Sequence, residues 1–314
     1  MRIAITGRQG QVARALTEAG PALGVETVTL GRPQLDLAVP ETVQPALKAA
    51  APDIVVNAAA YTAVDQAERE AELANSINGI GAGVVAEAAR ALGLPIIHLS
   101  TDYVFDGSKT SAYVEDDPVA PASVYGASKL AGEQAVAAVH GDHVILRTAW
   151  VYAPYGKNFV RTMLALAETR DEVRVVADQQ GCPTYAPDIA DAVIGITRNL
   201  LRDRSDPYLR GVFHLAGAGE TSWAGFAAAI FELLARKGCR RPILTPISTA
   251  EYPTPARRPS NSRLNCAKLA RIHGIELPSW RHSLATCLER LTNRGETGKS
   301  SHRGHGGHGV AKIV

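Results

Sequence analysis

The chain of 314 residues has only four cysteines, and none of them forms a C-x-x-C pair or has the spacing of zinc ligands. Reduced and mostly buried thiols are therefore expected, rather than a disulfide framework or a zinc site. No apolar stretch approaches the ~20 residues that a membrane-spanning helix needs. No charged-then-apolar signal sequence precedes the strand-like run Arg2–Thr6. These absences predict a cytoplasmic protein without a membrane segment.

A strong charge of either sign is also absent. The formal net charge is +2, with 46% hydrophobic and 20% charged residues, an ordinary composition for a globular enzyme. This balance does not attract the chain to nucleic acid or to an anionic membrane. A small anionic substrate is still compatible with it, because local patches matter more than the sum.

The first half of the chain alternates short apolar runs with helical stretches. The apolar runs are nearly continuous, as in parallel strands that are buried on both faces. Strands are predicted at residues 3–6, 25–30, 54–57, 95–100 and 143–148. Helices are predicted at residues 11–19, 41–50, 71–92 and 126–139. Repeated β-α units indicate an α/β fold with a Rossmann-type doubly wound parallel sheet, which binds ligands at the carboxyl ends of its strands.

After Trp150 the pattern loosens into proline-rich loops and separate helices, such as 221–237. Residues 173–176 and 212–215 are predicted to return to the sheet. The expected NAD(P)-binding domain comprises residues 1–150 and returning segments at about 172–216. The expected smaller, mixed C-terminal substrate lobe comprises residues 151–171 and 217–292.

The last segment, residues 293–314, is rich in Gly, Ser and Lys. Such a composition cannot bury enough apolar surface to order itself, so a disordered tail is expected. His302, His305 and His308 in this tail are an alternative metal-binding group.

A glycine-rich turn, residues 6–13, joins the first predicted strand to the first helix. Gly7 and Gly10 allow a tight bend and a close approach of phosphate to the backbone. The helix N-terminus offers free N–H groups and a positive dipole end to a pyrophosphate. Glycines also close ordinary loops, so it is the position at the start of a β-α-β unit that favours dinucleotide binding.

The second predicted strand ends in Leu30-Gly31-Arg32, without the carboxylate that binds the ribose 2′-hydroxyl in NAD-specific proteins. Arg32 is suited to a 2′-phosphate, which favours NADPH. NADH stays an alternative, because an ordinary surface arginine accounts for Arg32 equally well.

Tyr125 and Lys129 are four residues apart at the start of a predicted helix, so they project from one face. Reduction of a ketone by hydride needs a proton at the oxygen. A free tyrosine has a pKa of about 10, and a nearby lysine cation is expected to lower that pKa. Lys129 is also placed to hold the nicotinamide ribose. The Tyr-x-x-x-Lys pattern arises often by chance, so its weight depends on its surroundings.

Those surroundings carry polar groups at strand ends. Thr101 and Asp102 end the fourth predicted strand, where a doubly wound fold has its active site. The Thr101 hydroxyl either holds the substrate carbonyl oxygen beside Tyr125 or caps the strand end. The small residues of 57–62, after the third strand, leave room for the cofactor ribose. Chance explains poorly why so many strand ends bear suitable groups.

With these motifs the chain resembles the extended short-chain dehydrogenase/reductases and, within them, the family of dTDP-4-dehydrorhamnose reductases. The resemblance extends from Met1 to about Leu291. It is carried by residues 7–12, 56–65, 100–105, 124–132, 147–152, 178–184 and 253–259. The most specific segment is Pro253–Pro259, together with the Asn261–Leu264 segment that follows it.

The resemblance implies NAD(P)H-dependent reduction of dTDP-4-dehydro-6-deoxy-L-mannose to dTDP-L-rhamnose. Tyr125 would donate the proton, with Lys129 and Thr101 as the other catalytic residues. Asp36 and Leu37 would flank the adenine. Together, motifs and resemblance place the cofactor on Gly7, Gly10, Gln11, Val12, Arg32, Asp36, Leu37, Ala60, Tyr61, Thr62, Tyr125 and Lys129.

On the substrate side, the resemblance implies contacts of the sugar with Thr101, Asp102 and Trp150. Arg257 and Arg258 would bind the nucleotide diphosphate, because a planar guanidinium pairs bidentately with phosphate.

Two positions depart from the family's pattern. Some relatives hold a magnesium ion with glutamates at a dimer interface, and one of these would fall near Ala15, which offers no ligand. Neither that metal nor that dimer is expected, and the chain is predicted to be a monomer or a homodimer. Cys182 replaces a smaller residue, and no chemistry is assigned to it.

Two other functions stay open. One is reduction of a different nucleotide-linked 4-keto sugar. The other is a non-catalytic, NADP-binding regulatory subunit, although such proteins often lose the tyrosine or the lysine that this chain keeps.

Overall fold

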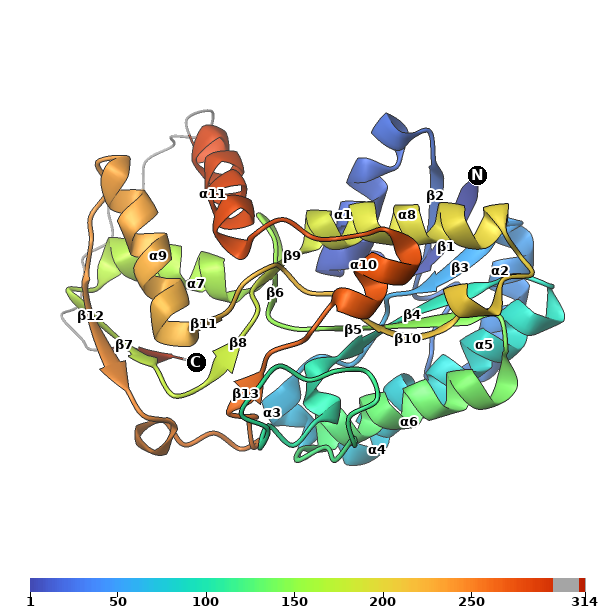
Figure 1. Ribbon diagram of the computed structural model, residues 1–314, viewed down its shortest axis with the longest axis horizontal. Coiled ribbons are helices and arrows are strands. Elements are labelled where there is room, and N and C mark those ends of the chain that lie inside the picture. Colours follow the sequence, from blue (N-terminus) through green and yellow to red (C-terminus); the bar gives the residue numbers. More distant parts are fainter. Residues whose placement is uncertain (296–310, 314) are drawn as a thin grey trace.

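The computed structural model describes residues 1–295 and 311–313. Its centre is a six-stranded, entirely parallel sheet in the order β10, β5, β4, β3, β1, β2 (Figure 1). The strands are β1 (Arg2–Thr6), β2 (Glu26–Leu30), β3 (Ile54–Asn57), β4 (Ile96–Thr101), β5 (His143–Thr148) and β10 (Gly211–His214). The inner strands are buried along nearly their whole length, as the continuous apolar runs predict. The prediction of an α/β doubly wound sheet is confirmed.

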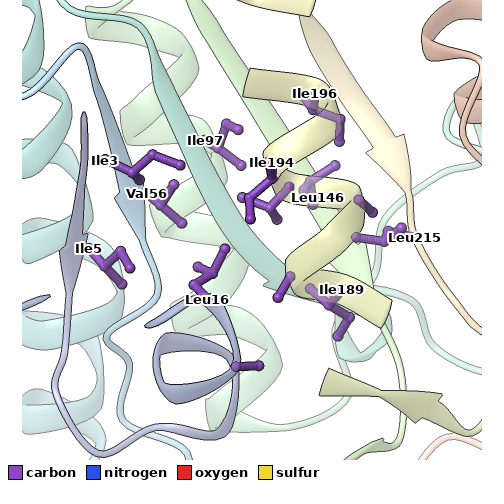
Figure 2. Packing of buried hydrophobic residues seen from close by; sticks show 14 of the residues in the cluster. Ile3, Ile5, Leu16, Val56, Ile97, Leu146, Ile189, Ile194, Ile196 and Leu215 are labelled. Atoms are coloured by element: carbon purple, nitrogen blue, oxygen red, sulfur yellow. The ribbon is translucent and has the colours of Figure 1, made fainter. Parts of the chain in front are cut away.

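Helices cover both faces of this sheet. Helices α1 (Gln11–Ala19) and α8 (Ala186–Arg202) cover one face, where Leu16, Ile189 and Ile194 pack toward the strands (Figure 2). Helices α2 (Val43–Ala50), α5 (Gly81–Ala91) and α6 (Val124–Val139) cover the other. The strand order turns back between β1 and β3, and a doubly wound fold binds its ligands at such a point.

The helical stretch predicted at 71–92 consists of three pieces. Helix α4 (Ala71–Asn75) leads into a π turn (Ser76–Ile80), and α5 follows it. Helix α6 packs closely on the π turn, because a Cβ on Gly132 would lie only 2.1 Å from the backbone oxygen of Asn78. Such π turns often occur at functional sites.

Strand β7 (Glu172–Val176) is not part of the central sheet. It pairs in parallel with β12 (Ile243–Ile247) and β14 (Ala311–Ile313). The prediction that residues 173–176 return to the central sheet is therefore wrong, whereas residues 212–215 do return, as β10 beside β5. The apolar side chains of β7 have their own helical cover, in α7 (Phe159–Thr169), α9 (Trp223–Arg236) and α11 (Trp280–Gly295).

The prediction of a disordered segment from residue 293 is also wrong in part. Helix α11 continues to Gly295, and Ala311–Ile313 pair with the free edge of β7 as β14. His302, His305 and His308 lie outside the described residues.

Two very small sheets link the two parts of the molecule. Strand β8 (Gln180–Gly181) lies between β11 (Thr221–Ser222) and β13 (Asn261–Ser262), and β6 (Val151–Tyr152) pairs with β9 (Thr184–Tyr185). The remaining elements are α3 (Val64–Ala67), α10 (Ala267–His273), and the short 3₁₀ turns η1 (Pro21–Leu23), η2 (Pro40–Thr42), η4 (Asp102–Val104), η5 (Pro207–Leu209) and η6 (Thr249–Glu251). Within the described ranges, no helix is both long and apolar enough to cross a bilayer.

All four cysteines are free thiols. Cys182 and Cys287 are buried, Cys266 is half-buried, and Cys239 is exposed.

Candidate active site

The glycine turn bends as its sequence predicts. Gly7 has a φ of 92°, a conformation that favours glycine, and its N–H donates to the oxygen of Leu30 at 2.6 Å. Gly10 precedes α1, no side chain of residues 1–295 or 311–313 caps that helix, and its first turn contains no acidic residue. A Cβ on Gly10 would meet nothing within 4 Å. The first N–H groups of α1, including those of Gln11 and Val12, are thus available to an anion, and this end of the helix fits a pyrophosphate.

The side chain of Gln11 connects this turn to the other part of the molecule. Its Nε2 donates to the oxygen of Val151 at 3.4 Å, and its Oε1 accepts from Asn158 Nδ2 at 2.9 Å. Asn158 is the N-cap of α7. These hydrogen bonds therefore connect the turn expected to bind cofactor with the lobe expected to bind substrate.

The edge after β2 has two arginines. Arg32 is exposed, and Arg8 donates to the oxygen of Arg32 at 3.2 Å and to Gln34 Oε1 at 2.7 Å. The sequence analysis missed Arg8, although its place inside the glycine turn, next to the end of β2, was a usable signal. Both guanidinium groups are suited to a 2′-phosphate.

Asp36 and Leu37 follow on the same segment. Asp36 Oδ1 accepts the N–H of Ala38 at 3.0 Å, and Leu37 is buried in the hydrophobic cluster of this face. These contacts do not test the expected roles beside an adenine.

The segment Ala60-Tyr61-Thr62 is held by Asn78, a residue of the π turn. Asn78 Oδ1 accepts the N–H of Tyr61 at 2.8 Å. Its Nδ2 donates to the oxygen of Tyr61 at 3.0 Å and to Ser128 Oγ at 2.9 Å. Asn78 thereby fixes the segment expected at the nicotinamide against α6. Sequence analysis missed it; an asparagine inside an alanine-rich helical stretch was the only signal.

Tyr125 lies in the first turn of α6, where Ser123 Oγ caps the helix by accepting the N–H of Gly126 at 3.1 Å. A Cβ on Gly126 would lie 2.2 Å from the oxygen of Tyr103, so only glycine lets α6 approach the η4 turn this closely. That approach brings the Tyr125 phenol into hydrogen-bond contact with the Thr101 hydroxyl. Tyr125 and Thr101, two of the predicted catalytic residues, thus come together at the carboxyl end of β4.

Burial sets the acidity of this site. It raises the pKa of Tyr125 to about 12, against the opposing effect of the hydrogen bond with Thr101. It lowers the pKa of Lys129 to about 8, although Glu133 favours the cation. The expected lowering of the Tyr125 pKa by Lys129 is not seen, because burial and the Asp102 carboxylate raise that pKa instead. The lysine Nζ donates to the oxygen of Leu99 at 2.6 Å. Tyr125 is therefore a neutral phenol near pH 7, the form that a proton donor needs.

A buried ion pair anchors α6 to the sheet. Arg147 of β5 donates to Glu133 from Nε at 3.0 Å and from Nη2 at 2.7 Å, and Ser100 of β4 donates to the same carboxylate. Both charged side chains are 5% exposed. Removing one partner would leave an uncompensated buried charge, so this pair holds the Tyr125 helix in place.

Asp102 is buried at the same strand end. Its Oδ1 accepts from the Thr101 hydroxyl at 3.1 Å, and Ser262 of β13 also hydrogen-bonds to its carboxylate. Oδ2 has no hydrogen-bond partner among the described residues. Burial raises the Asp102 pKa to about 6.

Trp150 has a φ of 48°, which is rare and costly for a residue other than glycine. Its ring stacks on Trp223 with 3.6 Å between centroids. A Cβ on Gly181 would lie 2.3 Å from the indole. Packing from β8 and α9 therefore enforces the unusual backbone of Trp150.

The two predicted arginines differ. Arg257 is exposed, whereas Arg258 forms a forked pair with Asp65, with Nη1–Oδ1 and Nη2–Oδ2 distances of 3.3 and 3.1 Å. The pair joins the 253–259 loop to the segment that follows β3.

The position expected near a metal ligand in some relatives, Ala15, is buried in α1. The described part of the chain has no group of three or more side chains that could hold a metal.

Comparison with known proteins decides the family. The profile of the family described as RmlD substrate binding domain matches residues 1–293. The chain belongs to this family. A curated RmlD relative, the dTDP-4-dehydrorhamnose reductase of Sinorhizobium fredii, is 56% identical over 297 residues, which are 94% of this chain and 99% of the relative. The resemblance inferred from the motifs is confirmed.

Solved RmlD-like structures agree. The dTDP-4-dehydrorhamnose reductase of Clostridium acetobutylicum has a TM-score of 0.85 and 37% identity, and the match covers 93% of this chain and all (100%) of that one. The enzyme of that name from Bacillus anthracis, solved in complex with NADP, has a TM-score of 0.84 and 36% identity, with 92% and 99% covered.

Proposed function

We propose that this RmlD-family chain is an NADPH-dependent reductase that converts dTDP-4-dehydro-6-deoxy-L-mannose to dTDP-L-rhamnose. The main support for this proposal is the contact between Tyr125 and Thr101 at the carboxyl end of β4. The start of α1, which no described side chain caps, lies at the same edge of the sheet. The dTDP-4-dehydrorhamnose reductases among its relatives, one of them bound to NADP, support the same choice of substrate and cofactor.

The cofactor would lie across the turning point of the sheet. The free N–H groups at the start of α1 would hold its pyrophosphate, and Arg32 with Arg8 would hold the 2′-phosphate. Lys129 would hold the nicotinamide ribose beside the segment Ala60–Thr62. When bound, the reduced nicotinamide supplies a hydride for the carbonyl carbon.

Tyr125 would then deliver its proton to the carbonyl oxygen, while the Thr101 hydroxyl holds that oxygen in place. A phenol with a pKa of about 12 keeps its proton at neutral pH. It gives the proton up only when the far more basic alkoxide develops. The ammonium of Lys129 would favour the resulting phenolate only after moving from the oxygen of Leu99 toward the phenol.

The substrate would be recognised by groups from both parts of the molecule. The Asp102 carboxylate, which is buried at the end of β4, would accept a sugar hydroxyl once the substrate opens access to it, and the Trp150 ring would form an apolar wall. The exposed Arg257 would pair with the diphosphate, whereas Arg258 would use the N–H groups that Asp65 leaves over. The same proposal places the enzyme in the cytoplasm, as a monomer or a homodimer.

NADPH oxidation measured on enzymatically generated dTDP-4-keto-rhamnose tests this function, with NADH in parallel. Rapid NADPH oxidation, with dTDP-L-rhamnose identified by NMR, is the expected result. A product with a different configuration at C4, or turnover only with another nucleotide sugar, would indicate a different 4-ketoreductase. Binding of NADPH without any turnover would indicate the regulatory alternative.

A further inference from the structure

A chain of buried polar side chains runs across three neighbouring strands to Lys129. Thr6 ends β1, Asn57 ends β3, and His98 lies in β4. The exposed fractions of Thr6, Asn57, His98 and Lys129 are 0, 1, 1 and 2%. Thr6 Oγ1 lies 2.6 Å from Asn57 Oδ1, Asn57 Nδ2 lies 3.0 Å from His98 Nδ1, and His98 Nε2 lies 3.5 Å from Lys129 Nζ. The mechanism above uses only the last of these residues.

The first link fixes the orientation of the Asn57 amide. Thr6 Oγ1 accepts the N–H groups of Ala58 and Ala59, both at 3.1 Å. These two bonds use the acceptor capacity of the hydroxyl, so its proton is donated to Asn57. A donor can point only at an acceptor, so the amide oxygen faces Thr6 and the amide NH₂ faces His98.

The second link fixes the imidazole tautomer. Because the Asn57 NH₂ points at Nδ1, this nitrogen must accept, and the proton of a neutral imidazole then lies on Nε2. The ring is neutral, since burial holds the pKa of His98 well below its usual range and the nearby Lys129 cation lowers it further. The Nε2–H group therefore faces Lys129 Nζ.

Two groups of β4 thus act on the same amine. The oxygen of Leu99 accepts from Nζ at 2.6 Å and draws it toward the strand. The Nε2–H of His98 presents a partial positive charge that opposes an ammonium at that place. Other titratable groups near this pair are Glu133 of α6, paired with Arg147 of β5, and His143 at the start of β5, whose pKa is lowered by burial.

We infer that His98, held as its Nε2–H tautomer by Thr6 and Asn57, is a positioning residue: it opposes the Lys129 ammonium at the oxygen of Leu99 and so favours its transfer to the cofactor. The inference rests on the proposed function, because it gives Lys129 its role. It also links the glycine turn to the catalytic helix, since Thr6 directly precedes Gly7.

The tautomer is measurable without activity. Long-range ¹H–¹⁵N spectra of the folded chain, with the His98→Asn variant for assignment, report which nitrogen of His98 is protonated. A protonated Nε2 and a bare Nδ1 are expected from about pH 6 to about pH 9. A proton on Nδ1, or an imidazolium in that range, would overturn the inference even if the chain is a fully active reductase.

Activity gives the second readout. In His98→Asn, the shorter amide still meets Asn57 but cannot reach Lys129, whereas in His98→Gln the amide extends to the position of Nε2. His98→Asn should lower kcat about tenfold and move the alkaline limb of the kcat/KM profile about half a pH unit upward, because the group that opposes the ammonium is gone. His98→Gln should recover part of the lost kcat and part of the shift of the alkaline limb.

The matched control is His273→Asn, which removes a buried imidazole in α10. This control is expected to change activity, if at all, by the same factor at every pH. The same behaviour in His98→Asn would show a merely structural role and refute the inference. If wild-type enzyme reduces none of the keto sugars offered, the proposed function fails, and the spectra alone decide the tautomer.

Discussion

The two sides of the site are built differently. The cofactor side is formed by the ends of strands of four to six residues in one parallel sheet. The proposed substrate side is formed by two-residue strands and loops, where Trp150 packs on Gly181, Ser262 hydrogen-bonds to Asp102 and Arg258 pairs with Asp65. The geometry of the cofactor side is therefore set within short stretches of sequence. The geometry of the substrate side depends on contacts between segments that are far apart along the chain. Changes on the two sides should separate chemistry from substrate binding.

The largest effect is expected on the cofactor side. Tyr125→Phe removes the proposed proton donor and leaves the aromatic ring in place. It should lower kcat by about a thousandfold, with the Kd for NADPH nearly unchanged. Steady-state rates and cofactor fluorescence titration check this, and a variant with near-normal kcat would disprove the role of the phenol.

Asp102 lies where the two sides meet, and its carboxylate should destabilise the fold at neutral pH. Its pKa rises from 3.8 to about 6 on folding. Its stabilising contribution is therefore intact below about pH 4 and is lost as the pH rises through about 6. Asp102→Asn removes this dependence, so its free energy of unfolding relative to wild type should increase by up to about 3 kcal/mol between about pH 4 and pH 7.

Urea unfolding of Asp102→Asn and wild type at both pH values measures this difference, with the exposed Glu41→Gln as control. Equal differences at the two pH values would mean that Asp102 is not desolvated.

On the substrate side, Gly181→Ala should disturb the Trp150 wall, because the added Cβ would lie 2.3 Å from the indole. Overpacking of this kind costs about 1–3 kcal/mol, so the KM for the sugar nucleotide should rise about tenfold or more while NADPH binding stays the same. Gly141→Ala, where a Cβ meets nothing within 4 Å, is the control. An equal rise in KM for the sugar nucleotide and for NADPH in Gly181→Ala would show that the two sides are not separate.

The smallest effect is expected at the exposed edge of the cofactor side. Arg32→Ala should raise the KM for NADPH about fivefold, because an exposed charge pair contributes only about 1 kcal/mol. The KM for NADH should not change. A parallel rise for both cofactors would place Arg32 away from the 2′-phosphate.

The same contrast explains what the sequence could predict. The glycine turn and the pair Tyr125–Lys129 depend on spacing within one element, and they were found from the sequence. The apolar run 173–176 reads like any buried strand, and only the cover from α7 and α9 places it in a separate sheet. Asn78 and His98 escaped notice because their partners, Tyr61, Asn57 and Lys129, are far away along the chain.

The central claim is hydride transfer to a keto sugar at the carboxyl edge of the six-stranded sheet. NADPH that carries deuterium at its reactive position tests this most directly, with the nucleotide-sugar product analysed by NMR and mass spectrometry. The account predicts one deuterium per product molecule, on C4 of the sugar. In Tyr125→Phe the amount of this labelled product should fall in proportion to the rate. A product without deuterium, or with deuterium at another carbon, would contradict it.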